Sequence, residues 1–207
     1  MRKLAVLLAL CLSFFGKADA QSPVGAWKYI SGEVTGILLI THTWFTVTEY
    51  KANEFLSSYG GTWKSDNDKE TSITILYNTE DKSQVGRSSV VPTSIQNDHL
   101  VTSSRGGGQQ EWTRIDDGNG TLAGNWRISS REQNGKMNPM PLAARRTLKI
   151  LTGTRFQWVA INIETGEFFG TGGGTYTFEN GTYTEKIEFF SRDNMRSGVK
   201  RSNAGCL

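Results

Sequence analysis

Short runs in which apolar and polar residues alternate recur along the chain after residue 20, and helical periodicity is nearly absent. The runs are rich in Thr, Tyr, Phe, Val, Ile and Trp and are separated by Gly, Asn, Asp and Ser. This pattern is typical of short antiparallel strands. We expect strands at 26–31, 36–40, 44–51, 55–64, 71–78, 88–95, 99–104 and 110–115, then at 125–131, 146–151, 156–163, 168–178 and 182–191. The chain is therefore predicted to be all-β, and only the segment 141–146 has helical character.

The second series of strands repeats the first. LITHTWFTV at 39–47 aligns with ILTGTRFQW at 150–158, and Gly60-Gly61 aligns with Gly173-Gly174. Such internal similarity predicts two copies of one structural unit. The predicted division of the chain is a first barrel unit at 21–118, a partial second barrel unit at 119–194 and a tail at 195–207.

The first 20 residues carry the pattern of a secretory signal peptide. A short basic head precedes an apolar run at 4–15, and a small-x-small end closes on Ala20. The apolar run is shorter than the roughly 20 residues that span a bilayer. We therefore expect cleavage after Ala20 and a secreted, periplasmic or outer-envelope protein without a transmembrane segment. Lipid attachment at Cys11 fits less well, because Leu10 stands where a small residue is wanted.

Charge and cysteine content narrow the range of partners. Three of the 23 basic and one of the 20 acidic residues lie in 1–20, so the rest of the chain has a net charge of about +1. This balance gives no electrostatic case for nucleic acid or an anionic membrane as a partner.

Cys206 is the one cysteine after residue 20, so an intramolecular disulfide cannot form. Stability has to come from a buried core.

A Gly-x-Trp motif opens each copy of the repeat. The motif residues are Gly25 and Trp27 in the first copy and Gly124 and Trp126 in the second. Followed by an antiparallel meander, the motif resembles that of the lipocalins and the wider calycin superfamily. The segment 149–194 is similar to secreted lipocalin-like proteins of Gram-negative bacteria, mostly of unassigned function. The resemblance implies two tandem lipocalin-like β-barrels, the second apparently truncated.

The resemblance also implies a structural role for the motif tryptophan. In lipocalins it packs across the closed end of the barrel beneath an arginine of the last strand, and here Arg114 would cover Trp27. Trp126 has no such arginine in a recognisable last strand. The sequence after residue 191 is polar and basic without strand pattern, so we expect either a truncated or frame-altered end or an edge supplied by another chain, and we favour truncation. Self-association through the open edge at 182–191 is a further expectation.

Catalytic and metal-binding patterns are weak. His42 and His99 have no Cys, His or carboxylate at metal-ligand spacing, and neither lies in a nucleophile motif. The glycines at 172–174 lack the Lys and the following helix of a phosphate loop, so a bulge in a bent strand is the better interpretation. Asn180-Gly181 predicts a tight hairpin turn. We expect no metal, no cofactor and no enzymatic activity.

Aromatic residues on the predicted strands are the best candidates for a ligand site. The candidate set is Trp158, Tyr176, Tyr183, Glu185, Phe189, Trp44, Trp63 and Tyr77. Alternation places Tyr183, Glu185 and Phe189 on one face of their strand. Glu185 could pair with Arg155, anchor a ligand, or act as a general acid or base. The aromatic rings could equally fill a barrel core.

The long connection at 130–146 lies where lipocalins carry a loop over the mouth of the barrel. Met137, Met140 and Leu142 would give such a lid an apolar underside, although the segment could also be a mobile loop or a strap between the two units. We predict a non-catalytic, exported binding module for a small apolar or amphipathic molecule. An interaction protein that uses an open sheet edge, a ligand-free structural module of the cell envelope and a calycin-type enzyme with barrel carboxylates are the alternatives.

Overall fold

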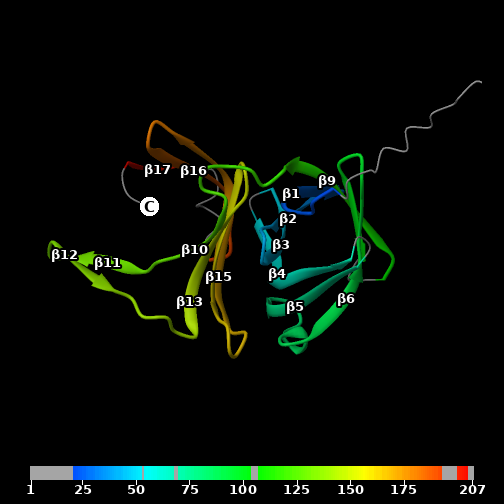
Figure 1. Ribbon diagram of the computed structural model, residues 1–207, viewed down its shortest axis with the longest axis horizontal. Coiled ribbons are helices and arrows are strands. Elements are labelled where there is room, and N and C mark those ends of the chain that lie inside the picture. The colour runs from blue at the N-terminus through cyan, green and yellow to red at the C-terminus, as the bar shows by residue number, and fades with distance from the viewer. Residues whose placement is uncertain (1–20, 53, 68–69, 104–106, 193–199, 205–207) are drawn as a thin grey trace, which may run out of the picture.

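The computed structural model describes residues 21–52, 54–67, 70–103, 107–192 and 200–204, and all structural statements concern these residues. Two antiparallel sheets pack against each other, and a small two-stranded hairpin projects from the second sheet (Figure 1). The predicted signal peptide at 1–20 lies outside the described residues. No helix in the described part of the chain has the length and hydropathy needed to cross a bilayer.

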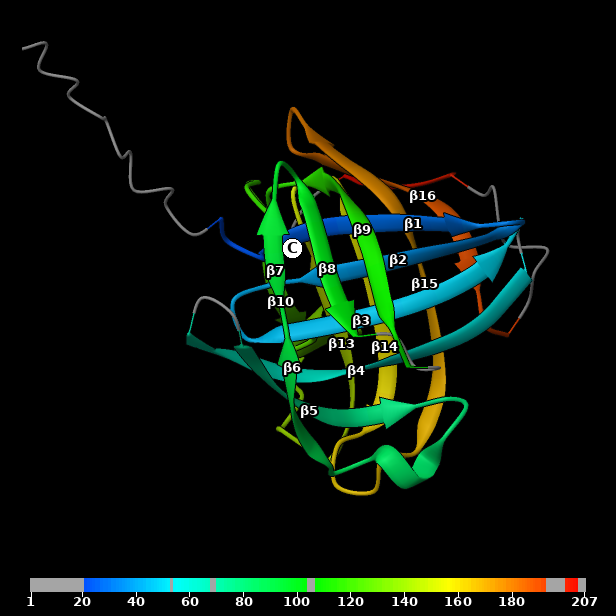
Figure 2. The same ribbon diagram turned by 90° about the vertical axis from the view of Figure 1, so that its right-hand side faces the viewer.

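The first sheet is a nearly closed barrel of nine strands. They are β1 (Gly25–Ser31), β2 (Val34–Ile40), β3 (Trp44–Lys51), β4 (Glu54–Asn67), β5 (Glu70–Asn78), β6 (Ser88–Pro92), β7 (Ser94–Gln96), β8 (His99–Ser103) and β9 (Gln109–Asp116), with a 3₁₀ turn η1 (Lys82–Gln84) after β5. The order in the sheet is β6-β5-β4-β3-β2-β1-β9-β8-β7. Consecutive strands β6 and β7 thus occupy opposite edges, so the sheet curls round on itself (Figure 2). This architecture is compatible with a calycin-like fold.

The interior of the barrel is filled by apolar side chains. The buried cluster consists of Trp27, Leu38, Ile40, Phe45, Val47, Leu100 and Trp112. Trp27 is fully buried, and its Nε1 donates a hydrogen bond to the carbonyl oxygen of Pro23 at 2.8 Å. The Arg114 guanidinium lies 3.9 Å from the centroid of the Trp27 ring. This is the contact that the resemblance implied, and such a pair contributes about 0.5–2 kcal/mol to stability.

The second sheet has six strands and lies against the outer face of the barrel (Figure 1). Its strands, in sheet order, are β10 (Gly124–Arg127), β13 (Arg145–Leu151), β14 (Arg155–Asn162), β15 (Phe168–Glu179), β16 (Thr182–Phe190) and β17 (Lys200–Ala204). The projecting hairpin is formed by β11 (Ser130–Gln133) and β12 (Lys136–Pro139). Asn180 and Gly181 have φ values of 51° and 75°, as the predicted two-residue turn between β15 and β16 requires.

The two sheets share one core. Its buried residues are Ala26, Ile37, Leu39, Trp44, Tyr50 and Tyr77 from the first sheet and Ile150, Val159, Ile161 and Phe189 from the second. A polar group is enclosed at its centre. The Gln157 amide contacts Thr46 Oγ1 at 3.2 Å, and its Nε2 donates to Ser58 Oγ and to Thr171 Oγ1. Because the polar atoms of Gln157 are hydrogen-bonded, its burial is tolerated, and these bonds fix the position of one sheet on the other.

Both sheets carry a β-bulge at a glycine pair. The strand register shifts within Gly60-Gly61 of β4 and within Gly173-Gly174 of β15. A Cβ atom on the second glycine of each pair would lie 1.9 Å from the carbonyl oxygen of Thr74 and 2.0 Å from that of Lys186. The close approach of two backbones therefore requires glycine at these positions, as predicted for 172–174.

The second bulge overturns the predicted face of Phe189. Uninterrupted alternation placed Phe189 beside Tyr183 on one face of β16. The register shift opposite β15 moves Phe189 to the other face, where it joins the core between the sheets, while Ile187 and Phe190 pack with Tyr183. One extra residue in a bulge reverses the inside-outside pattern of every residue that follows it.

Substituting Gly174 by alanine is expected to lower the free energy of unfolding by about 1–3 kcal/mol, because the strands would have to separate to admit the methyl group. Gly120→Ala is the matched control, since a Cβ there would meet its nearest atom at 3.2 Å. Urea denaturation of both variants measures the difference. Equal stability of the Gly174 variant and the unsubstituted protein would contradict the requirement for glycine.

Several predicted elements differ in the structure. The segment 141–146 is not helical, because Arg145 and Arg146 already belong to β13, where they pair with β14. The predicted strand at 88–95 is divided at Thr93, where the chain passes from one edge of the barrel sheet to the other. The predicted strand at 125–131 is divided between β10 and β11.

The prediction of a tail without strands is wrong for residues 200–204. This segment forms β17, which pairs antiparallel with β16. The backbone groups along an edge strand can pair with an extended segment whatever the side chains of that segment are. The polar and basic composition of the tail therefore did not indicate this strand. Residues 182–186 of β16 are therefore not an open edge, and the outer strands of the second sheet are β10 and β17. The parts of the tail at 195–199 and 205–207 lie outside the described residues.

Candidate functional site

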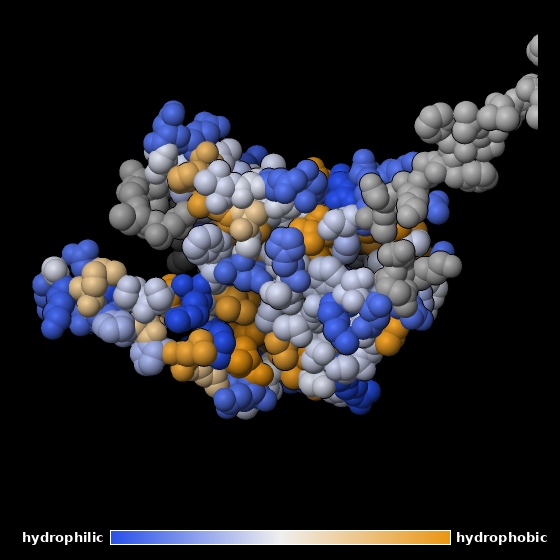
Figure 3. Space-filling view, viewed as in Figure 1, coloured by the Kyte–Doolittle hydropathy of each residue, from blue (hydrophilic) through white to orange (hydrophobic). Residues whose placement is uncertain are grey.

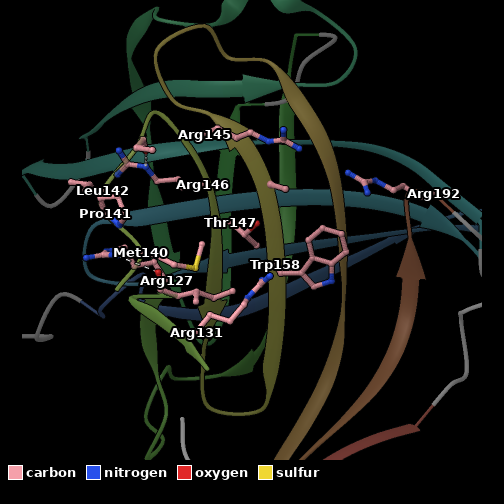
Figure 4. Close-up of a pocket in the computed structure, with 13 residues that line it drawn as sticks. Arg127, Arg131, Met140, Pro141, Leu142, Arg145, Arg146, Thr147, Trp158 and Arg192 are labelled. Carbon is pink, nitrogen blue, oxygen red and sulfur yellow. Dashed lines mark hydrogen bonds between the residues drawn. The ribbon is translucent and has the colours of Figure 1, made fainter. Parts of the chain in front are cut away.

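A cavity of about 530 Å³ lies on the face of the second sheet that points away from the barrel (Figure 4). Its lining residues are Arg127, Ile128, Arg131, Met140, Pro141, Leu142, Ala143, Arg145, Arg146, Thr147, Trp158, Ala160 and Arg192. Strongly hydrophilic and apolar residues meet at the base of the projecting hairpin, where the surface is hollowed (Figure 3). The volume falls within the range of about 300–1,000 Å³ that small-molecule sites occupy.

The floor of the cavity is formed by Trp158 and Ala160 of β14. These residues alternate with Val159 and Ile161, which belong to the core between the sheets. Trp158 is partly buried, and Gly172 lies opposite it on β15. A Cβ on Gly172 would lie 2.8 Å from the indole Nε1. The glycine therefore leaves room for the indole ring on this face of the sheet.

The wall of the cavity comes from the connection between β10 and β13. Met140 and Leu142, both predicted lid residues, line the cavity, and their exposed fractions are 39% and 64%. Met137, on β12 of the projecting hairpin, is 59% exposed and is not among the lining residues. The hairpin lies on the side of the second sheet away from the barrel (Figure 1), so the connection is not a strap between the two sheets.

A second cavity, of about 130 Å³, lies inside the barrel. Trp63, Phe45, Trp112 and Leu100 are among its lining residues. Its volume is below the usual range for ligand sites, because the side chains of the buried cluster fill most of the barrel. Of the aromatic residues predicted to bind a ligand, Trp63 alone lines this cavity and Trp158 alone lines the larger one.

Three of the predicted ligand residues are in the core between the sheets. Trp44, Tyr77 and Phe189 have exposed fractions of 7%, 0% and 1%. The Tyr77 hydroxyl bonds with Ser58 Oγ at 2.9 Å, and burial raises the pKa of Tyr77 to about 12. These side chains line neither cavity, so they serve packing.

Tyr176, Tyr183 and Glu185 lie on the outward face of the second sheet, next to each other but outside the larger cavity. Glu185 forms an ion pair with Lys149 and accepts a hydrogen bond from the Tyr183 hydroxyl at 2.8 Å. Burial and the neighbouring carboxylate raise the pKa of Tyr183. Glu185 is thus paired with a basic side chain, but its partner is Lys149 and not Arg155.

Arg155 points to the opposite face of the sheet, where it pairs with Glu188. Glu188 also accepts a hydrogen bond from the Tyr50 hydroxyl of the barrel at 2.7 Å. The bulge in the β15–β16 pair explains both partners, because it turns Glu188 rather than Glu185 towards the first sheet. Arg155 and Glu188 therefore belong to the contact between the sheets.

The arginines around the larger cavity were not identified from the sequence. They lie on β10, β11 and β13 and just after the end of β16, so 65 residues separate the first from the last. The sequence feature that could have identified them is the basic character of 141–146 and of the residues after 191. This feature is weak evidence for a site, because arginine is common on protein surfaces. Only the folding of β13, β14 and the hairpin brings these side chains together.

The described residues contain no group of three or more His, Cys, Asp or Glu side chains placed to hold a metal ion. No protein-family model matches the chain, and neither the curated proteins nor the solved structures gave a significant match.

Proposed function

We propose that the protein is an exported, non-catalytic binding module that holds a small amphipathic molecule in the cavity on the second sheet. The observation that carries this proposal is a cavity of about 530 Å³ with the indole of Trp158 in its floor and the exposed apolar side chains of Met140 and Leu142 in its wall. Exposed apolar side chains gathered in a concavity are typical of ligand sites.

The proposal includes two tandem lipocalin-like units, of which the second is partial. Matching local geometry in the two Gly-x-Trp motifs supports this part. Gly25 and Gly124 have φ values of 131° and 136°, and Trp126 Nε1 donates to the carbonyl oxygen of Leu122 at 2.8 Å, four residues back, as Trp27 does to Pro23. In the first unit the barrel interior is filled, whereas in the partial second unit the face of the sheet that points away from the barrel carries the larger cavity.

Replacing Trp158 with leucine is expected to weaken binding of the neutral apolar dye Nile red by about tenfold, since buried aromatic side chains contribute disproportionately to binding. Dye fluorescence during titration measures the affinity. Trp63→Leu in the barrel cavity is the matched control and should leave the affinity unchanged. Weaker binding in the Trp63 variant alone would move the site into the barrel, and absence of dye binding by the unsubstituted protein would refute the proposal.

A further inference from the structure

The rim of the larger cavity carries five arginine side chains. They are Arg127, Arg131, Arg145, Arg146 and Arg192. None of the described residues that line the cavity is aspartate or glutamate. The formal charge around the cavity is therefore strongly positive, although the chain after residue 20 is nearly neutral overall.

These arginines have no acidic partner among the described residues. Elsewhere the protein pairs its partly buried cations: Lys149 with Glu185, Arg155 with Glu188, and Arg114 with Asp98. None of the described ion pairs includes an arginine of the cavity rim. Like charges gathered without a counter-charge repel one another, so the cluster lowers stability unless an anion neutralises it.

Neutral groups hold several of the rim arginines in place. Arg146 Nε donates to the carbonyl oxygen of Ala143 at 2.9 Å, and Arg192 Nε donates to that of Phe169 at 2.7 Å. The Arg145 guanidinium lies 4.1 Å from the centroid of the Phe169 ring. Such contacts restrict the side chains without neutralising their charge. The guanidinium groups of Arg145, Arg146 and Arg192 are therefore oriented in advance for an anionic ligand.

The apolar and cationic parts of the cavity lie beside each other. In Figure 4, Trp158 lies between Arg131 on one side and Arg192 on the other, and Met140 lies close to Arg127. A ligand that satisfies both parts needs an anionic head group next to an apolar body. The planar guanidinium group matches the geometry of carboxylate and phosphate oxygens.

We propose that the cavity selects an amphipathic anion whose carboxylate or phosphate head group binds the rim arginines and whose apolar body covers Trp158. This inference rests on the proposed function of the same cavity and adds the charge of the ligand. A free fatty acid and a membrane phospholipid share this chemistry. Nucleic acid fits less well, because the positive charge is confined to one cavity and the rest of the chain is nearly neutral.

The test compares two ligands of equal chain length, decanoate and its neutral methyl ester, by isothermal titration below the concentration at which micelles form. We expect decanoate to bind at least about tenfold more tightly than the ester, with an affinity that falls as salt is raised because salt screens exposed charges. Equal, salt-independent affinities would overturn the charge selectivity. If neither ligand nor Nile red binds, the proposed function itself fails.

The double variant Arg131→Gln, Arg145→Gln tests whether the rim supplies the selectivity. It should lose at least about tenfold in decanoate affinity and keep its affinity for the methyl ester. Arg87→Gln, an exposed position outside the cavity, is the control and should keep both affinities. Thermal unfolding verifies that all variants are folded. Unchanged decanoate affinity in the folded double variant would contradict the proposal.

Vesicles separate the two sources of the head group. Binding to phosphatidylglycerol vesicles that is stronger than to phosphatidylcholine vesicles, and that is lost in the double variant, would support the proposal with a membrane lipid as ligand. Binding of decanoate without binding to either vesicle would support it with a free amphiphile. Vesicle binding that the double variant retains would count against the cavity as the anion site.

Discussion

Phe189→Ala is expected to lower the free energy of unfolding by about 3–5 kcal/mol, the usual cost of removing a fully buried phenylalanine. The Phe189 ring is 1% exposed in the core between the sheets, and its centroid lies 5.3 Å from that of Tyr50 and 6.5 Å from that of Phe55. Both partners belong to the barrel. The substitution therefore leaves a cavity that weakens the contact between the two sheets.

Guanidinium denaturation of Phe189→Ala and Phe178→Ala gives a matched comparison. Phe178 is also on the second sheet but is 38% exposed, so its truncation should cost less than about 1 kcal/mol. If the two variants were equally stable, Phe189 would not be a core residue. A loss of ligand affinity in Phe189→Ala without loss of stability would restore the original prediction of a binding role.

Asp116→Asn is expected to destabilise the protein by about 2–4 kcal/mol, because a charged acceptor with several donors is lost. Asp116 ends β9 of the barrel and joins it to the turn between β13 and β14. Its donors are the backbone N–H groups of Ala26, Gly118, Gly153 and Thr154 and the hydroxyl groups of Thr152 and Thr154, at 2.7–3.2 Å. Asparagine cannot accept all of these bonds, since its amide nitrogen is a donor.

The same carboxylate gives stability a specific pH dependence. Burial alone would raise the pKa of Asp116, but hydrogen bonds from Thr154, Gly118, Thr152 and Gly153 outweigh it and lower the pKa. A lowered pKa in the folded state stabilises the protein above the unfolded value of about 3.9, and this stabilisation is lost as pH falls through the folded value. The stability difference between the unsubstituted protein and Asp116→Asn should therefore shrink below about pH 4.

Denaturation midpoints measured at pH 7 and at several values below pH 4 provide the test. Glu164→Gln is the control: Glu164 is exposed in the turn that follows β14, and its substitution should change stability little at any pH. A stability difference for Asp116→Asn that stays constant down to pH 3 would show that the carboxylate is not the acceptor on which the joint between the sheets depends.

Sequence patterns predicted most of the strands because each strand is a local property. Alternation of side chains, glycine at close backbone contacts and positive φ at Asn180-Gly181 are readable in a single segment. The glycine pairs were recognised as bulges for the same reason. The effect of the second bulge on Phe189 was not predicted. The face on which Phe189 lies depends on how many residues of β15 and β16 oppose each other, and this number is known only once the two strands are paired.

The candidate site was predictable only in its apolar part. Trp158, Met140 and Leu142 were identified because aromatic and methionine side chains on a predicted strand and its covering loop suggest a binding surface. The charged part was missed, and the near-neutral net charge of the chain gave no electrostatic case for nucleic acid or an anionic membrane as a partner. Net charge averages over the whole surface, whereas binding depends on the charges within a few ångströms of the ligand.

By itself the sequence determined an all-β chain and the places of its turns and bulges, since hydrophobic alternation and glycine requirements act over a few residues. The packing of Trp27 beneath Arg114 followed from the resemblance to lipocalins and not from a local pattern. Tertiary structure alone decided that the two sheets share a core, that residues 200–204 add a strand, and that five arginines line the same cavity as Trp158. Strand pairing and sheet packing bring together residues that are far apart in the chain. The charge and the shape of the cavity depend on these long-range contacts, which no local pattern in the sequence reveals.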